Sequence, residues 1–157
     1  MTAIYTWQRE ADTVAFNLNV THMNEILTSL TRSSTTFDQV DRYNQPLDWR
    51  ARAMATWTRG AMSTTLVVNH ADDYINDSLV TDVAIDAWTT LDLNVSYDFS
   101  ATRSLLAGAR IAVGISNLLD EEPPFASGPQ FSEPIGFDAY NADAMGRFIT
   151  ARFTKRW

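Results

Sequence analysis

The feature that most constrains the fold of this chain is a two-residue alternation between apolar and polar side chains. In "DWRARAMATWTRG" the apolar side chains fall on every second residue from Trp49 to Trp57, and Met54 is the one apolar residue among the intervening positions. Successive side chains of a β-strand point to opposite faces, so the segment predicts a strand with one apolar and one polar face.

The same alternation recurs in "TAIYTWQ", "TVAFNLNVTH", "AMSTTLVVNHADDY", "AIDAWTTLDLNVSYDF", "LLAGARIAVGISN" and "GRFITARFTKRW". We expect an antiparallel meander of about six or seven long strands. A two-residue turn at Arg59-Gly60 would place Trp57 opposite Met62, and a short link at 100–104 would place Phe99 opposite Leu105. In both pairings the apolar positions of the two strands share a face.

The predicted connections alternate in length. Short ones fall near 9–12, 59–60 and 100–104, and long ones at about 26–46, 75–84 and 118–145. Loops of ~20 residues without structure are uncommon in compact soluble domains. Long loops at one end and short turns at the other are typical of outer-membrane β-barrels.

Strand length and aromatic placement also favour a membrane barrel. The predicted strands run to ~11–15 residues, which suits a tilted membrane crossing better than an ordinary globular sheet. Trp49 and Trp57 would stand roughly 20 Å apart along the membrane normal, close to the spacing of two interfacial girdles. Tyr97, Phe99, Phe153 and Trp157 would extend the girdle on the short-turn side. A half-buried sheet in a soluble sandwich shows the same alternation and remains the alternative.

Composition narrows the class further. With 157 residues, 45% of them hydrophobic and 20% charged, the chain suits one folded domain and contains no apolar run long enough for a membrane helix. The net charge of −7 argues against nucleic-acid binding, and the absence of cysteine excludes disulfides and thiolate metal sites. The opening "MTAIYTWQREAD" lacks the features of a signal peptide, so we expect any export signal to lie on other sequence.

Few residues suggest chemistry. His22 and His70 lie on different predicted strands with no nearby His or Cys, and "DDYIND" favours a solvated acidic turn over a Ca²⁺ site. No catalytic triad or phosphate loop is recognisable, so the sequence predicts no enzyme, no cofactor and no metal site.

Charged side chains are expected on the polar face of the strands. We expect them to form ion pairs and hydrogen bonds that brace the wall, with contact to a plug or a solute path as the alternative. They are Arg50, Arg52, Asp86, Asp92, Asp98, Arg110, Arg152 and Arg156.

The chain resembles the C-terminal end of TonB-dependent outer-membrane receptors. "GARIAVGISNLLDEEPPF" is similar to the family's penultimate strand and its Asn-Leu-Phe-Asp-x-x-Pro-Pro segment, here with Leu119 in place of Phe. "GFDAYNADAMGRFITARFTKRW" resembles the final loop, Gly-Arg turn and last strand with its terminal aromatic. "NQPLDWRARAMATWTRG" with "LVVNHADDYIND" resembles an earlier hairpin of the same barrels.

The resemblance implies the last six or seven strands of a ~22-stranded barrel in the bacterial outer membrane. The whole receptor would take up a scarce solute such as a siderophore, vitamin or oligosaccharide. The plug domain, the segment that contacts the TonB complex and the other barrel strands would lie on sequence upstream of Met1. The strand ending at Trp157 would be read by the barrel-insertion machinery. A passive porin-type channel and a soluble all-β binding module are the alternatives.

Overall fold

The computed structural model of the chain describes residues 1–99, 105–128 and 136–156. The predicted link at 100–104 and the terminal Trp157 therefore lie outside the described residues. The described residues contain no helix, and therefore none that is long and apolar enough to cross a membrane.

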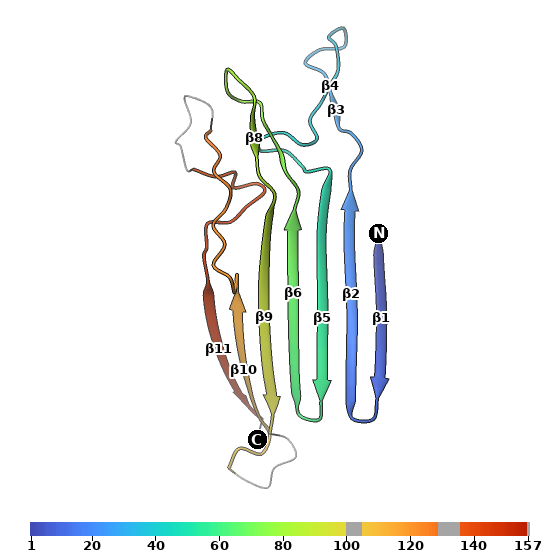
Figure 1. Cartoon of the computed structure of the whole chain (residues 1–157), viewed down its shortest axis with the longest axis vertical. Coiled ribbons are helices and arrows are strands. Elements are labelled where there is room, and N and C mark those ends of the chain that lie inside the picture. The colour runs from blue at the N-terminus through green and yellow to red at the C-terminus, as the bar shows by residue number, and fades with distance from the viewer. Residues whose placement is uncertain (100–104, 129–135, 157) are drawn as a thin grey trace.

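One antiparallel sheet of seven strands makes up most of the structure, and its strands pair in the order β1-β2-β5-β6-β9-β10-β11 (Figure 1). These strands are β1 Thr2–Arg9, β2 Asp12–His22, β5 Trp49–Arg59, β6 Met62–Ala71, β9 Trp88–Asp98, β10 Ala109–Ser116 and β11 Phe148–Lys155. Each of the six long strands after β1 pairs antiparallel with the long strand before it, so the predicted all-β antiparallel meander is confirmed.

Two short hairpins lie in the long loops. The loop between β2 and β5 contains β3 Leu27–Thr28 and β4 Phe37–Asp38, and the loop between β6 and β9 contains β7 Tyr74–Asn76 and β8 Val83–Ile85. The predicted strand over 84–99 is therefore divided, with Ile85 in the loop hairpin and the wall strand beginning at Trp88. The described parts of the long loops lie at one end of the sheet, and the β1–β2 and β5–β6 turns lie at the other (Figure 1), as the alternation of connection lengths predicts.

The register places apolar residues in continuous rows across the sheet. The central row contains one residue from each long strand, and all seven are apolar: Tyr5, Phe16, Ala55, Leu66, Leu93, Ile115 and Ile149. The adjacent row toward the short turns contains Trp7, Val14, Trp57, Thr64, Val95, Val113 and Ala151. Neither row contains a charged side chain, so the middle of one face of the sheet is an uncharged apolar surface. The charged pair Asp12 and Arg59 lies at the short-turn end of this face.

The structure corrects the predicted turn between β5 and β6. Arg59 pairs with Met62, so the two-residue turn is Gly60-Ala61, and Trp57 lies opposite Thr64 rather than Met62. Gly60 has a φ of +55°, the left-handed conformation that hairpin turns of this length require and that glycine adopts without strain.

The predicted pairing of Phe99 with Leu105 is also wrong. The N–H of Phe99 donates to the carbonyl of Ala109 at 2.8 Å, and Leu105 precedes β10 with a side chain that is 91% exposed. The two register errors displace the pairing by two and four residues. Because both are even numbers, the predicted faces of the strands are nevertheless correct.

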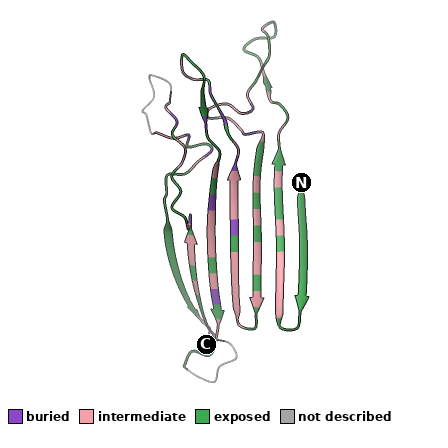
Figure 2. Cartoon of the chain, viewed as in Figure 1, coloured by how far each residue is buried: buried purple, intermediate pink, exposed green. Residues whose placement is uncertain are grey.

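The packed core lies among the loops and not under the sheet. Figure 2 shows β1 exposed along its whole length and most of the remaining wall exposed or half-buried. The buried apolar cluster, called here the loop core, consists of Leu47, Ala71, Tyr74, Ile85 and Ala126, with Tyr43 packed against it. No second layer of the described structure covers either face of the seven strands, and the sheet is not closed into a barrel.

Candidate functional site

Hydrogen bonds between neighbouring strands run across the polar face. Arg52 donates to the side-chain oxygen of Asn69 at 2.6 Å. The side-chain N–H₂ of Asn69 donates to Asp92 at 3.1 Å and to the Thr90 hydroxyl at 3.3 Å. The second oxygen of Asp92 accepts the N–H of Asn117 at 3.0 Å. This ladder joins β5, β6, β9 and the start of the third long loop. Charged side chains of the polar face therefore connect neighbouring strands, as the sequence predicts for them.

A second polar group lies at the short-turn end of the same face. Arg110 on β10 lies 3.7 Å from the carboxylate of Asp98 on β9 and donates to the Ser96 hydroxyl at 3.0 Å. The sequence predicts Asp98 and Arg110 on one hairpin, and the structure brings them together. The sequence predicts Asp86 on the polar face of a wall strand, but the structure does not place it in one. Asp86 precedes β9 and lies near Glu121 and Glu122.

A hollow of about 860 Å³ opens over this part of the polar face. We call it the arginine hollow. Its polar lining consists of Asn94, Asp98, Arg110, Thr150, Arg152, Thr154 and Arg156, and the small residues Gly108, Ala109, Ala112, Gly114 and Ala151 complete it. The alternation of each strand places the three arginines on one face, but the hollow itself depends on the curl of β10 and β11 (Figure 1), which the sequence does not reveal.

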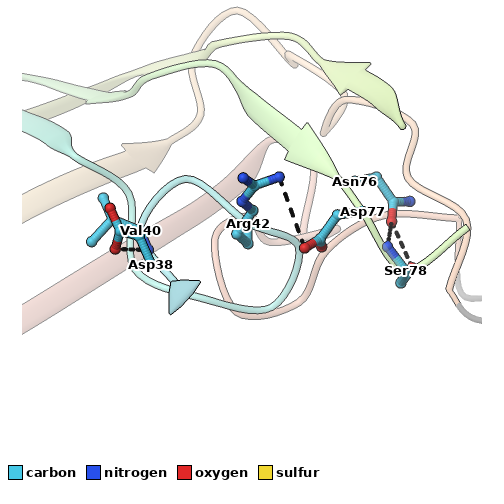
Figure 3. A network of polar contacts seen from close by, with 6 residues as sticks. All are labelled: Asp38, Val40, Arg42, Asn76, Asp77 and Ser78. Atoms are coloured by element: carbon cyan, nitrogen blue, oxygen red, sulfur yellow. Dashed lines mark hydrogen bonds and ion pairs between the residues drawn. The ribbon is translucent and has the colours of Figure 1, made fainter. Parts of the chain in front are cut away.

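The three long loops form one connected structure at the other end of the sheet. Arg42 of the first loop forms an ion pair with Asp77 of the second at 3.9 Å (Figure 3). Asn76 of the second loop is buried and donates to the carbonyl of Ser127 in the third loop at 2.7 Å, while its oxygen accepts from Ser78.

Asp138 fixes the third loop against the first. Its buried carboxylate accepts the backbone N–H groups of Asn44 at 2.9 Å and Tyr140 at 3.0 Å, and the side-chain amide of Asn141 at 2.9 Å. Asn141 in turn accepts a hydrogen bond from Arg50 of β5. Sequence reasoning missed Asp138 and Asn141 because no local pattern marks a loop carboxylate that is buried by segments ~95 residues away.

Burial raises the pKa of three acidic groups in this loop structure. Burial, followed by the negative charge of Asp138, raises the pKa of the Tyr74 hydroxyl and of the Tyr43 hydroxyl. Burial also raises the pKa of Asp41, although its carboxylate accepts the N–H of Asp48. In all three groups, burial among the loops disfavours the charged form.

The two histidines lie at the loop-side border of the apolar face. His22 stacks on Trp49 with ring centroids 4.1 Å apart, and His70 forms a 2.8 Å hydrogen bond with Thr89. Within the described residues, no group of three His, Asp or Glu side chains could hold a metal ion. In "DDYIND" the acidic residues Asp73 and Asp77 are exposed, as expected. The segment is not a simple turn, however, because Tyr74–Asn76 forms β7 and Asn76 is buried in loop contacts.

The fold and its two faces define the class of protein: a single-layer antiparallel β-wall with long, interconnected loops at one end. No family model, no curated protein and no solved structure matches the chain.

Proposed function

We propose that this chain is the C-terminal part of the barrel wall of a TonB-dependent receptor in the bacterial outer membrane. One observation supports this most: the middle of one sheet face is uncharged and apolar across seven adjacent strands, and no part of the described chain packs on it. Water would hydrate such a face unfavourably, whereas lipid tails would cover it at no cost.

The borders of the apolar face support lipid as its environment. At the short-turn end Trp57 donates its indole N–H to Asp12 at 2.9 Å, and Arg59 lies 3.8 Å from the same carboxylate. At the loop end Trp49 stacks on His22. Trp49 and Trp57 begin and nearly end one strand, so they would stand roughly 20 Å apart along the normal of a tilted barrel, near the height of a lipid-facing band.

The side of the sheet on which residues are buried argues against a soluble barrel. Five residues of the long strands are buried. The alternation of β6 and β9 places four of them, Val67, Ala71, Thr90 and Ser96, on the polar face, and the fifth, Ala109, is the first residue of β10 and lies on the apolar face. The arginine hollow opens on the polar face as well. A soluble barrel or sandwich would turn its apolar face inward, whereas a membrane barrel turns its polar face to the lumen.

The resemblance around Asn117 to Pro124 supports a receptor over a passive porin-type channel. In this proposal the long loops form the external surface that meets the solute, a siderophore, vitamin or oligosaccharide. Other strands of a ~22-stranded barrel cover the free edges. A plug domain fills the lumen, and an N-terminal segment contacts the TonB complex. The barrel-insertion machinery reads the last strand. We assign no catalytic activity or cofactor to this part of the chain.

The lipid-facing assignment is tested with single cysteines, because the chain contains none of its own. Leu66→Cys and Thr65→Cys are neighbours on β6 that point to the apolar and polar faces. Each variant is labelled with a small fluorophore in the outer-membrane fraction, and its quenching by brominated lipid is measured. We expect strong quenching at position 66 and little at position 65.

Equal quenching at the two positions, or recovery of the protein in the aqueous fraction without detergent, would contradict the membrane assignment and favour a soluble all-β binding module. The receptor and the porin-type channel are separated by the coding sequence that precedes this segment. A plug domain there is expected for a receptor, and its absence from the complete protein would favour a plain channel.

A further inference from the structure

The arginine hollow concentrates positive charge in a chain whose net charge is −7. Its lining contains three arginines and one carboxylate, that of Asp98. Asp98 pairs with Arg110. Among the described residues, neither Arg152 nor Arg156 has a carboxylate within ion-pair distance. Two guanidinium groups in the hollow therefore lack a counter-charge from the described part of the chain.

Strand register fixes the spacing of the three arginines. Arg110 pairs with Thr154, which lies midway between Arg152 and Arg156 on β11. The ladder continues past the end of β11, because the N–H of Arg156 donates to the carbonyl of Gly108 at 3.0 Å. Arg110 is thus a diagonal neighbour of both other arginines, at ~7–8 Å between backbone positions. Long side chains on one face of such a triangle reach a common ligand.

The floor of the hollow leaves room for that ligand. Ala112 pairs with Arg152, and Gly114 pairs with Thr150 in the adjacent row. A side chain at Gly114 would have its first carbon 2.8 Å from the Thr150 hydroxyl and 3.3 Å from the Asn94 amide. The missing side chain keeps both groups accessible in the lining. The Asn94 amide can donate to a ligand, and the Thr150 hydroxyl can do so by turning from the Gly114 carbonyl, to which it donates at 3.3 Å.

We propose that the arginine hollow binds a small organic or inorganic polyanion through its carboxylate or phosphate groups. Guanidinium groups match both oxyanions with paired, charge-assisted hydrogen bonds. Arg152 and Arg156 supply the uncompensated charge, and Arg110, oriented by Asp98 and Ser96, completes the triangle. This site lies at the short-turn end of the wall and is separate from the loop surface of the proposed receptor. The proposal depends only on the geometry of the sheet.

The test measures binding of citrate and, separately, of pyrophosphate to the full chain refolded in detergent micelles, by calorimetry at low ionic strength. We expect saturable binding of at least one probe, and the tighter of the two identifies the preferred group. Arg152→Gln should weaken binding roughly tenfold or more, since a charge-assisted hydrogen bond is lost. Arg152→Lys keeps the positive charge but loses the paired N–H donors of the guanidinium group. Its affinity should lie between that of the unmodified chain and that of Arg152→Gln.

Arg59→Gln is the matched control. It removes an arginine from the same end of the sheet, but from the apolar face, where Arg59 pairs with Asp12. Its affinity should equal that of the unmodified chain, and the circular dichroism of all variants should show the same strand content. Absence of saturable binding up to ~10 mM of both probes, or an equal loss in Arg152→Gln and Arg59→Gln, would overturn the proposal.

Discussion

At the scale of single residues, the short-turn end depends on a few backbone positions in the left-handed region. Glu10, Gly60 and Gly108 have φ values of +53°, +55° and +75°. An added Cβ at Gly60 would meet nothing within 4 Å, whereas at Gly108 it would lie 2.6 Å from the carbonyl oxygen of Arg156. Gly60 is therefore required for its conformation alone, and Gly108 for its conformation and for the close approach of β11.

This difference predicts unequal costs for the same substitution. Gly60→Ala should lower the free energy of unfolding by about 1 kcal/mol, the cost of a left-handed alanine. Gly108→Ala should lower it by roughly 2–4 kcal/mol, because the end of β11 must also move away from the new methyl group. Urea unfolding in detergent micelles, followed by tryptophan fluorescence, measures both. Equal costs would show that the contact with Arg156 does not constrain this turn.

At the scale of elements, the β3–β4 hairpin depends on one carboxylate. Only two residue pairs form its ladder. One oxygen of Asp38 accepts the N–H of Ile26 at 2.9 Å. The same oxygen accepts the N–H of Val40 at 3.0 Å (Figure 3). The backbone N–H of Ile26, followed by that of Val40, lowers the pKa of Asp38 below its ordinary value of 3.8.

The sign of this shift predicts an acid-sensitive hairpin. A carboxylate whose pKa is lowered by folding stabilises the fold above its ordinary pKa, and the stabilisation is lost as the pH falls through the lowered value. We expect the N–H groups of Ile26 and Val40 to exchange with solvent faster, relative to intrinsic rates, below about pH 4. Asp38→Asn should show fast exchange already at pH 6, and Asp73→Asn, in another loop, should not. Identical pH profiles in all three proteins would contradict this role for Asp38.

At the same scale, the sequence predicts the faces of the strands better than it predicts the positions of their turns. Alternation identifies the faces of Trp49 to Trp57 correctly because side-chain direction is a local property of a strand. The position of each turn is less well determined: a shift by an even number of residues leaves apolar facing apolar, so pattern alone cannot separate Gly60-Ala61 from Arg59-Gly60. The contacts of Asp138 and the curl that forms the arginine hollow depend on segments that are distant in sequence. Neither feature produces a periodic pattern in the sequence from which it could be predicted.

At the scale of the whole molecule, the wall has two free edges that run in the same direction. Seven strands alternate in direction, so β1 and β11 both run from the loop end to the short-turn end (Figure 1). Direct pairing of β1 with β11, in one chain or between two parallel copies, would be parallel. An all-antiparallel closure needs an odd number of additional strands between these edges, which agrees with the ~15 further strands of the proposed barrel.

The free edges predict how the chain associates by itself. Antiparallel pairing is slightly more stable than parallel pairing, so two copies should join through equivalent edges, β1 with β1 or β11 with β11. Single cysteines near the strand centres and on the same face, Tyr5→Cys and Ala151→Cys, are treated in micelles with a short thiol cross-linker. Each variant alone should give cross-linked dimers, and a mixture of the two should give few mixed dimers. Predominance of mixed dimers would show parallel β1–β11 pairing, which would remove the argument for an odd number of further strands.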